Sequence, residues 1–94
     1  MRILITEDEF LVGIQLEQDL RSAGCSIVGP FGTLETATEA ARRERFDLAL
    51  LDINLNGEPV YPLADELSAR AVPFIFLSGY LSAALPERFR GSPQ

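Results

Sequence analysis

The chain has 94 residues, 47% of them apolar, and a net charge of −6, which suffices for one domain with one hydrophobic core. No apolar stretch is long enough to span a bilayer, and the acidic balance argues against a protein that binds nucleic acid through its phosphates. The eight basic residues are all arginine, so this chain has no histidine or lysine for acid–base catalysis, metal ligation, Schiff-base chemistry or phosphohistidine formation.

The start of the chain and its single cysteine bear on where the protein works. Met1, Arg2 and three aliphatic residues form too short a segment for a signal peptide. Cys25 has no partner for an internal disulfide, and it opens an apolar segment. We therefore expect a cytoplasmic protein with one domain over residues 1–94, in which Cys25 is a buried apolar thiol.

The first half of the chain alternates between short apolar strands and helical patterns. Residues Arg2–Thr6 predict a strand, and Glu9–Ala23 predict an amphipathic helix that Gly24 ends. Cys25–Val28 is expected to be a second strand, and a second helix follows over residues 33–44, capped by the threonine at its start. The expected core-facing residues of the two helices are Val12, Leu16 and Leu20 in the first, and Ala37, Ala40 and Ala41 in the second.

The second half repeats this alternation. Residues Phe46–Leu51 predict a third strand, and the turn formers that follow predict a loop over Asp52–Pro59. Val60–Ala71 predicts a helix, which tolerates Pro62 because this proline lies in the first turn. A fourth strand is expected at Phe74–Leu77. The remaining residues predict one helical turn and a disordered tail, over Ser82–Leu85 and residues 87–94.

Strand and helix thus alternate along the chain, which predicts an α/β fold with a parallel sheet and helices on both faces. In such doubly wound sheets the ligand site lies outside the carboxyl ends of the strands. Glu7 and Asp8 follow the first predicted strand, Asp52 follows the third, and Ser78 follows the fourth. We therefore expect these four side chains to meet at one edge of the sheet.

The three acids at this edge predict a bound cation. Glu7, Asp8 and Asp52 would repel one another at close range unless a positive ion neutralised them, and Mg²⁺ prefers such hard oxygen ligands. Two of the acids also have a structural alternative. Asp8 lies where the N-cap of a helix would be, and Asp52 could start a turn after a buried strand. The pattern alone leaves these alternatives open.

Three segments together resemble the receiver domain of two-component response regulators. They are I-L-I-T-E-D-E at the first strand, L-L-D-I-N-L-N-G at the third, and F-I-F-L-S-G-Y at the fourth. The last segment is similar to the Phe-Ala-Thr-Gly-Tyr signature of a single-domain receiver subfamily. The resemblance covers residues 2–86 and implies a flavodoxin-like, doubly wound parallel sheet with the strand order 2-1-3-4.

The resemblance also implies roles for the acids. Asp52 matches the phosphoacceptor of the family, whose carboxylate holds a phosphoryl group as an acyl phosphate. Glu7 and Asp8 match the acid pair that binds Mg²⁺ together with this aspartate. The backbone carbonyl of Asn54 matches the remaining protein ligand of the family, which would make the Asn54 side chain incidental.

Beyond the fourth strand the resemblance is partial. Ser78 matches a residue whose hydroxyl contacts the phosphoryl group, and Tyr80 matches a position that either acts as a switch or covers the core. Receiver domains continue into a fifth strand with a lysine that pairs with the phosphoryl group, and then a fifth helix, whereas this sequence stops before them and has no lysine. Arg88 or Arg90 could substitute for the lysine. We expect Phe74–Leu77 to form an open apolar edge, and two copies to cover it as a homodimer or swapped assembly.

The leading hypothesis is a receiver that takes a phosphoryl group from a sensor histidine kinase or phosphotransfer protein onto Asp52 with Mg²⁺. It would act on a downstream protein partner and not as an enzyme on metabolites. The alternative is a truncated receiver-fold interaction module without phosphorylation. A haloacid-dehalogenase-like phosphatase would need a second aspartate two residues after the nucleophile, where this chain has Asn54. Neither nucleic acid nor a membrane is an expected partner.

Overall fold

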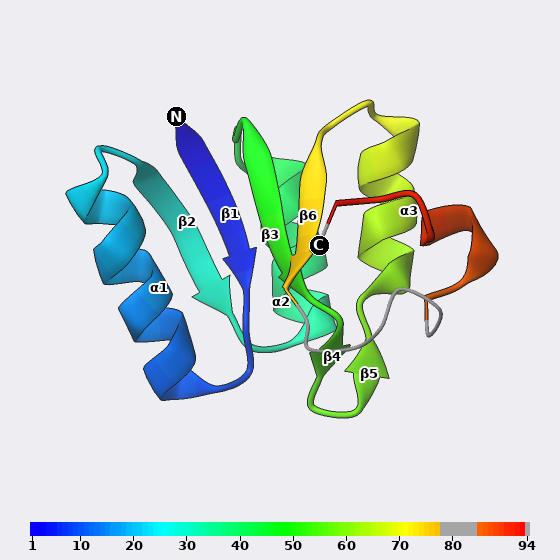
Figure 1. Cartoon of the computed structure of the whole chain (residues 1–94), viewed down its shortest axis with the longest axis horizontal. Helices are drawn as coiled ribbons and strands as arrows, with labels where there is room; N and C mark the ends of the chain where they lie inside the picture. The colour runs from blue at the N-terminus through cyan, green and yellow to red at the C-terminus, as the bar shows by residue number, and fades with distance from the viewer. Residues whose placement is uncertain (78–84, 94) are drawn as a thin grey trace.

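The computed structural model describes residues 1–77 and 85–93, and Figure 1 shows an α/β fold. Four parallel strands form one sheet in the order β2-β1-β3-β6, which confirms the predicted order 2-1-3-4. A small antiparallel hairpin of β4 and β5 follows β3. The elements are β1 (Arg2–Thr6), α1 (Phe10–Ser22), β2 (Ser26–Phe31), α2 (Leu34–Arg43), β3 (Leu48–Asp52), β4 (Asn54–Leu55), β5 (Glu58–Pro59), α3 (Tyr61–Ala69), β6 (Phe74–Leu77) and a 3-10 helix (Glu87–Phe89).

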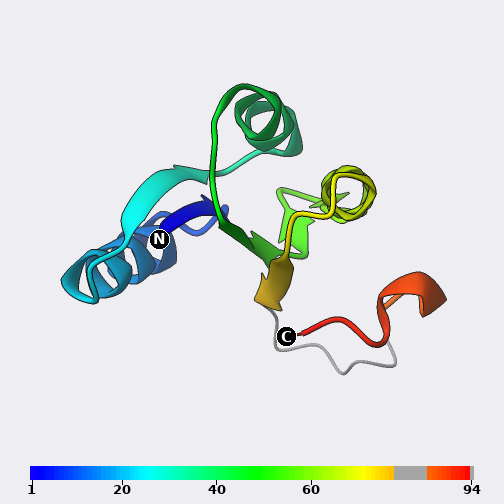
Figure 2. The ribbon, with the colours of Figure 1, turned by 90° about the horizontal axis from the view of Figure 1, so that it is seen from above.

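The helices cover both faces of the sheet, with α2 and α3 on one face and α1 on the other (Figure 2). The face under α2 and α3 holds the larger core, in which Leu4, Leu51 and Phe76 are fully buried. The α1 face holds a smaller core around Ile5 and Leu50. The central strands β1 and β3 thus bury side chains on both faces, which explains why their sequences are apolar throughout.

Strand β2 is longer than predicted, since it continues through Gly29 and Pro30 to Phe31. The proline is tolerated because β2 is an edge strand, where a missing backbone N–H breaks no ladder hydrogen bond. Its pairing with β1 is irregular at this point, between Leu4 and Thr6. The Gly-Pro pair therefore distorts the strand and does not end it.

Helix α1 buries only part of the predicted stripe. Leu16 and Leu20 pack against the sheet, but Val12 is 50% exposed, and Gly13 is the buried residue of the helix. A Cβ on Gly13 would lie 3.2 Å from Pro30 Cγ, so the glycine lets the start of the helix approach β2 closely. The prediction that Val12 faces the core is wrong, because the close approach to Pro30 makes Gly13, and not Val12, part of the buried face of the helix.

Helices α2 and α3 follow the predicted pattern. Thr33 caps α2, because its Oγ1 accepts a hydrogen bond from the Thr36 N–H at 3.2 Å. The three alanines predicted to face the core are fully buried, and their small size lets α2 lie close to the sheet. In α3, Pro62 lies in the first turn as predicted.

The segment predicted as a loop after β3 contains the β4–β5 hairpin. Its turn residues Asn56 and Gly57 have φ angles of 52° and 89°, the left-handed region that Asn-Gly hairpin turns require. The Gly57 N–H donates to Asn54 Oδ1 at 2.8 Å. The Asn54 side chain therefore holds the turn, which corrects the prediction that it is incidental.

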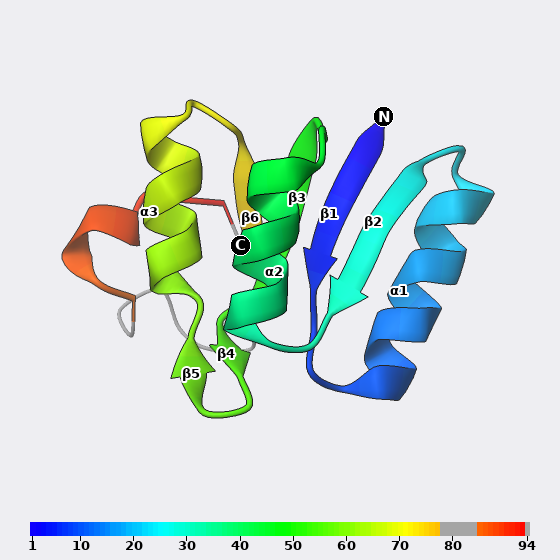
Figure 3. The ribbon, with the colours of Figure 1, turned by 180° about the vertical axis from the view of Figure 1, so that it is seen from behind.

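The end of the described chain differs from the predicted disordered tail. Residues 85–93 lie along the outside of α3 and β6 (Figures 1 and 3), and Phe89 is only 3% exposed. Burial of this aromatic ring holds the segment in place, since it is the kind of contact that dominates core energetics. The ring packs among the aromatic side chains of Tyr61, Phe74 and Phe76.

Polar contacts also hold this segment. The Arg88 guanidinium donates to both carboxylate oxygens of Asp65, at 2.8 and 3.0 Å. The Phe76 N–H donates to the Pro93 carbonyl at 3.0 Å. The edge of β6 was expected to be open, but the chain's own end covers part of it.

The remaining general expectations concern the cysteine and the membrane. Cys25 is half-buried and packs against the core of the α1 face, as an apolar thiol would. Across residues 1–77 and 85–93, no helix has the length and apolar character needed to cross a membrane.

Candidate functional site

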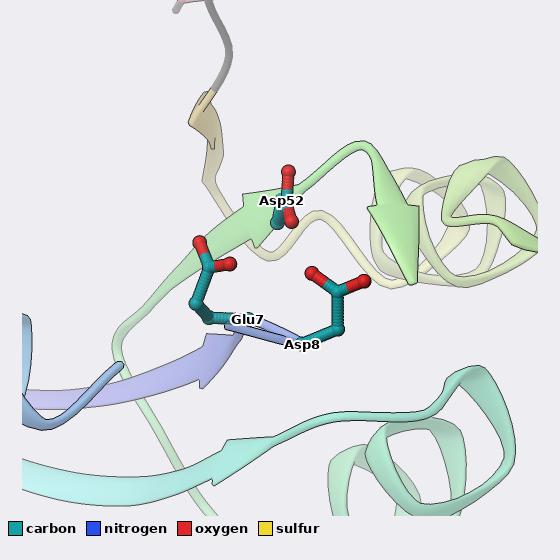
Figure 4. A group of neighbouring side chains, drawn as sticks. All are labelled: Glu7, Asp8 and Asp52. Carbon is teal, nitrogen blue, oxygen red and sulfur yellow. The ribbon is translucent and has the colours of Figure 1, made fainter. Parts of the chain in front are cut away.

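Glu7, Asp8 and Asp52 lie together at the carboxyl ends of β1 and β3. These strands are parallel neighbours, with Thr6 opposite Leu51, so Asp52 ends its strand beside the residues that follow β1. Carboxylate oxygens of the three acids lie within 4.8 Å of one another, and Figure 4 shows the side chains gathered around a common space. The structure therefore brings together the three acids that the sequence places at this edge.

A buried hydrogen bond fixes the position of Asp52. This residue ends β3, and its N–H donates to Thr6 Oγ1 at 3.1 Å. Thr6 is fully buried at the end of β1, so the bond ties the two strand ends together inside the protein. The sequence does not predict this role, because a threonine at the end of an apolar strand signals no more than β-propensity.

The surroundings of Asp52 oppose its ionisation. Partial removal of the carboxylate from water is the main cause, and together with the negative charges of Glu7 and Asp8 it raises the pKa of Asp52 from the ordinary 3.8 to about 7. Without a cation, Asp52 therefore takes up a proton near neutral pH. A positive ion among the three acids would offset the repulsion from Glu7 and Asp8, which is one of the reasons that the pKa of Asp52 is raised.

Asp8 shows the opposite behaviour. Its Oδ2 accepts a hydrogen bond from the Asn56 backbone N–H at 2.9 Å, and this bond is the main reason that the pKa of Asp8 is lowered. The N-cap of α1 is Glu9, which makes no side-chain capping bond. The alternative role of Asp8 as a helix cap is therefore wrong, and its carboxylate is held from the hairpin instead.

Glu7 is fixed mainly through the backbone around it. Its own N–H donates to the Phe31 carbonyl at 2.9 Å, which joins the β1–α1 loop to the end of β2. Its Oε1 accepts a hydrogen bond from the Glu9 N–H at 3.0 Å. The longer side chain of Glu7 thus bends back over its own loop while it stays within reach of the other two acids.

The donor set fits a hard divalent cation. Within the part of the chain that the structure describes, every ion pair joins an arginine to an acid outside the cluster. Three carboxylates without a basic partner suit Mg²⁺, which prefers oxygen ligands, and not metals that select nitrogen or sulfur. The chemistry of the residues present therefore agrees with the predicted metal.

Other predicted site residues are only partly accounted for. Ser78 and Tyr80 lie outside the described residues, and a ligand role for the Asn54 carbonyl stays a prediction. Arg88 is paired with Asp65, and the Arg90 Nε donates to the Leu85 carbonyl at 3.4 Å. The geometry gives no support to the idea that either arginine replaces the family lysine.

Comparison with known proteins places this arrangement in a family. No model of a known protein family matches the chain. The solution structure of SdrG from Sphingomonas melonis Fr1 matches it with a TM-score of 0.86 at 37% identity, over 99% of this chain and 80% of SdrG. The response regulator TrrA of Thermotoga maritima, solved in complex with the histidine kinase ThkA, has the same fold, with a TM-score of 0.80 at 24% identity over 97% of this chain and 79% of the matched chain. This chain belongs to the response regulator receiver domains.

Two further matches bear on the state and extent of this receiver domain. SdrG was also solved in a BeF3-activated conformation, which matches with a TM-score of 0.80 at 36% identity, over 98% of this chain and 79% of SdrG. The transcriptional regulatory protein PdtaR of Mycobacterium tuberculosis is 34% identical over 90 residues, which make up 95% of this chain and 44% of PdtaR. The receiver domain thus spans less than half the length of this curated relative. The matches confirm the predicted receiver resemblance and support a phosphoacceptor role in two-component signalling.

Proposed function

We propose that Asp52 accepts a phosphoryl group from a sensor histidine kinase or a phosphotransfer protein. The observation that carries the proposal is the convergence of Asp52 with Glu7 and Asp8, whose carboxylate oxygens lie within 4.8 Å of one another. In the reaction, an oxygen of the ionised Asp52 carboxylate forms a bond to phosphorus, and the bond from phosphorus to the donor nitrogen breaks. The electron pair of that bond leaves with the donor, and Asp52 becomes an acyl phosphate.

We also propose that Mg²⁺ is the cofactor of this site. Glu7, Asp8 and Asp52 would hold the ion, with the backbone carbonyl of Asn54 as a further ligand. When bound, the ion neutralises negative charge on the carboxylates and on the phosphoryl oxygens. The chain's own contribution is to fix the acids: the hydrogen bond from the Asp52 N–H to Thr6 and the one from the Asn56 N–H to Asp8 hold two of them in place.

The readout of phosphorylation belongs to the residues after β6. By resemblance, the Ser78 hydroxyl donates a hydrogen bond to a phosphoryl oxygen, and Tyr80 either switches or covers the core. We also propose that the protein is cytoplasmic and does not act as an enzyme on metabolites. A downstream protein partner would then bind the surface that changes.

We also propose that two copies of the chain associate. The apolar strand β6 lies at the edge of the sheet, which favours pairing with a second copy. The bond from the Phe76 N–H to the Pro93 carbonyl would have to break before that edge could pair along its length. Light scattering over a concentration series tests the proposal, and a monomer throughout the series would contradict it.

The phosphoacceptor proposal is tested with a small phosphodonor. Incubation with acetyl phosphate and Mg²⁺ is expected to add the mass of one phosphoryl group, and EDTA or Asp52→Asn is expected to prevent the addition. Asp19→Asn is the matched control, because Asp19 lies on α1 and its carboxylate bonds to Gln15, outside the acid cluster. Absence of the added mass, together with equal partner binding by the Asp52→Asn variant, would favour the interaction module without phosphorylation.

A further inference from the structure

Asn56 connects three loops that surround the acid cluster. It lies at the tip of the β4–β5 hairpin, and its backbone N–H donates to Asp8 Oδ2 at 2.9 Å. Its side-chain Nδ2 donates to the Gly32 carbonyl at 3.0 Å. Asp8 belongs to the loop between β1 and α1, and Gly32 to the loop between β2 and α2. One exposed residue therefore joins the hairpin to both loops.

The two loops that Asn56 reaches already lie against each other. The Glu7 N–H donates to the Phe31 carbonyl at 2.9 Å, and a Cβ on Gly32 would lie 3.8 Å from Asp8 Cα. The contacts of Asn56 add the hairpin to this pair, so the backbone around Asp8 is held from two sides. Figure 4 shows one oxygen of the Asp8 carboxylate on the side of the other two acids.

The requirements of the turn explain only part of this arrangement. A φ of 52° at Asn56, followed by glycine, is what a two-residue hairpin turn needs. Glycine or aspartate at the same position would satisfy that backbone geometry equally. The turn does not require the two bonds that Asn56 makes to Asp8 and Gly32, and both bonds point toward the loops around the acid pair.

We propose that Asn56 is a positioning residue for the metal-binding acids, an inference that rests on the proposed function of the cluster. Its N–H fixes one oxygen of Asp8, and its side-chain amide holds the hairpin where that N–H can reach Asp8. Mg²⁺ demands nearly ideal octahedral geometry, so a carboxylate that is fixed in advance loses less freedom when it binds the ion. Asn56 thereby raises the affinity for Mg²⁺ from outside the ligand set.

The experiment compares Asn56→Gly with Gly57→Ala in the full chain. The first variant keeps the backbone N–H and the positive φ but removes the amide that anchors the hairpin. The second strains the same turn, since alanine disfavours a φ of 89°, yet its Cβ would meet nothing within 4 Å and both contacts of Asn56 remain. Mg²⁺ alone is titrated into each protein and followed through amide resonances near the acids. Urea unfolding in EDTA measures the stability of each variant.

We expect Asn56→Gly to raise the Kd for Mg²⁺ about three- to tenfold, the equivalent of one hydrogen bond, and Gly57→Ala to change it less than about twofold. Without metal, the amide proton of residue 56 is expected to exchange faster in Asn56→Gly. Equal Mg²⁺ affinities of Asn56→Gly and the unsubstituted protein would overturn the proposal. A loss in Gly57→Ala as large as that in Asn56→Gly would also overturn it, because affinity would then follow the stability of the hairpin alone.

The result can be separated from the proposed function. If Asp52 takes up no phosphoryl group but Mg²⁺ binds and Asn56→Gly weakens that binding, the phosphoacceptor proposal fails and the positioning role stands. If Asp52 is phosphorylated and the Mg²⁺ affinity does not depend on Asn56, the phosphoacceptor role stands and the positioning role fails. Absence of any Mg²⁺ binding overturns the positioning role in either case.

Discussion

Carboxylate oxygens of Asp8 and Asp52 lie within 4.8 Å of each other, yet the pKa values of the two acids are shifted in opposite directions. The backbone N–H of Asn56 favours the charged form of Asp8. Among residues 1–77 and 85–93, no backbone N–H favours the charged form of Asp52 in this way, and its partial removal from water beside two other acids favours its neutral form. Without a metal, the cluster therefore destabilises the ionised form of Asp52, the acid that is proposed to receive the phosphoryl group.

Replacement of Asp52 by Asn is expected to stabilise the metal-free protein. The folded pKa of about 7 lies above the ordinary 3.8, so the stability of the unsubstituted protein falls as pH rises from about 4 to about 7 and is constant above that range. The full shift corresponds to about 4 kcal/mol, but solvent screens a partly exposed carboxylate, so we expect a gain of about 1–2 kcal/mol at pH 8.

Urea unfolding in EDTA at pH 4 and pH 8 measures this gain. The stability difference between Asp52→Asn and the unsubstituted protein is expected to be near zero at pH 4 and largest at pH 8. Asp19→Asn on α1 serves as the control for a lost surface charge. A variant that is less stable than the unsubstituted protein at pH 8 would show that the acids do not repel one another as the structure indicates.

Addition of Mg²⁺ is expected to raise the melting temperature, and to raise it more at pH 8 than at pH 6. The ion and the proton compete for Asp52, whose pKa of about 7 lies between these two values. At a concentration one hundred times the Kd, a ligand of the native state adds about 2.7 kcal/mol of stability. Calorimetry with and without Mg²⁺ measures the effect, with Asp52→Asn as the control that should lose most of it. An equal rise at both pH values would argue that the ion binds elsewhere.

Replacement of Thr6 by Val tests the buried bond behind Asp52. Valine has nearly the same shape but leaves the Asp52 N–H without its acceptor, so we expect a loss of about 1–3 kcal/mol in the free energy of unfolding. Thr6→Ser keeps the hydroxyl and is expected to retain the bond. Urea unfolding of both variants, with the acyl-phosphate yield as a second measurement, checks the prediction. A valine variant as stable as the unsubstituted protein would mean that the bond contributes nothing.

The sequence predicts the strands and the acids well because both depend on simple rules. Strands buried on both faces, such as β1 and β3, are short continuous apolar runs, and the residues after parallel neighbours must share one edge. The sequence alone therefore suffices to place Glu7, Asp8 and Asp52 together.

Features that depend on distant contacts are not predictable in this way. The exposure of Val12 follows from the approach of Gly13 to Pro30, which no helical periodicity encodes. The contact of Asn56 with Asp8 joins residues 48 positions apart. The Asn-Gly pair in the sequence therefore indicates a turn, but it does not indicate that Asn56 contacts Asp8. Phe89 lies in a polar segment, and its burial depends on an aromatic surface made by α3 and β6.

That last contact gives a direct test of how the end of the chain is held. Phe89 is 3% exposed and lies 5.6 Å from Tyr61 and 5.4 Å from Phe76 between ring centroids, so Phe89→Ala is expected to reduce the free energy of unfolding by about 3–5 kcal/mol. Phe10→Ala is the matched control, because Phe10 is 75% exposed and its loss is expected to change stability by less than about 0.5 kcal/mol.

The same two variants test whether this segment shields the edge of β6. If burial of Phe89 keeps the Pro93 carbonyl on the Phe76 N–H, then Phe89→Ala frees that N–H for pairing with a second copy. Light scattering is then expected to show a larger mass for Phe89→Ala than for Phe10→Ala at the same concentration. Identical stabilities and masses for the two variants would mean that residues 85–93 do not pack on α3 and β6 in solution. Removal of a buried ring lowers the free energy of unfolding more than removal of an exposed ring does.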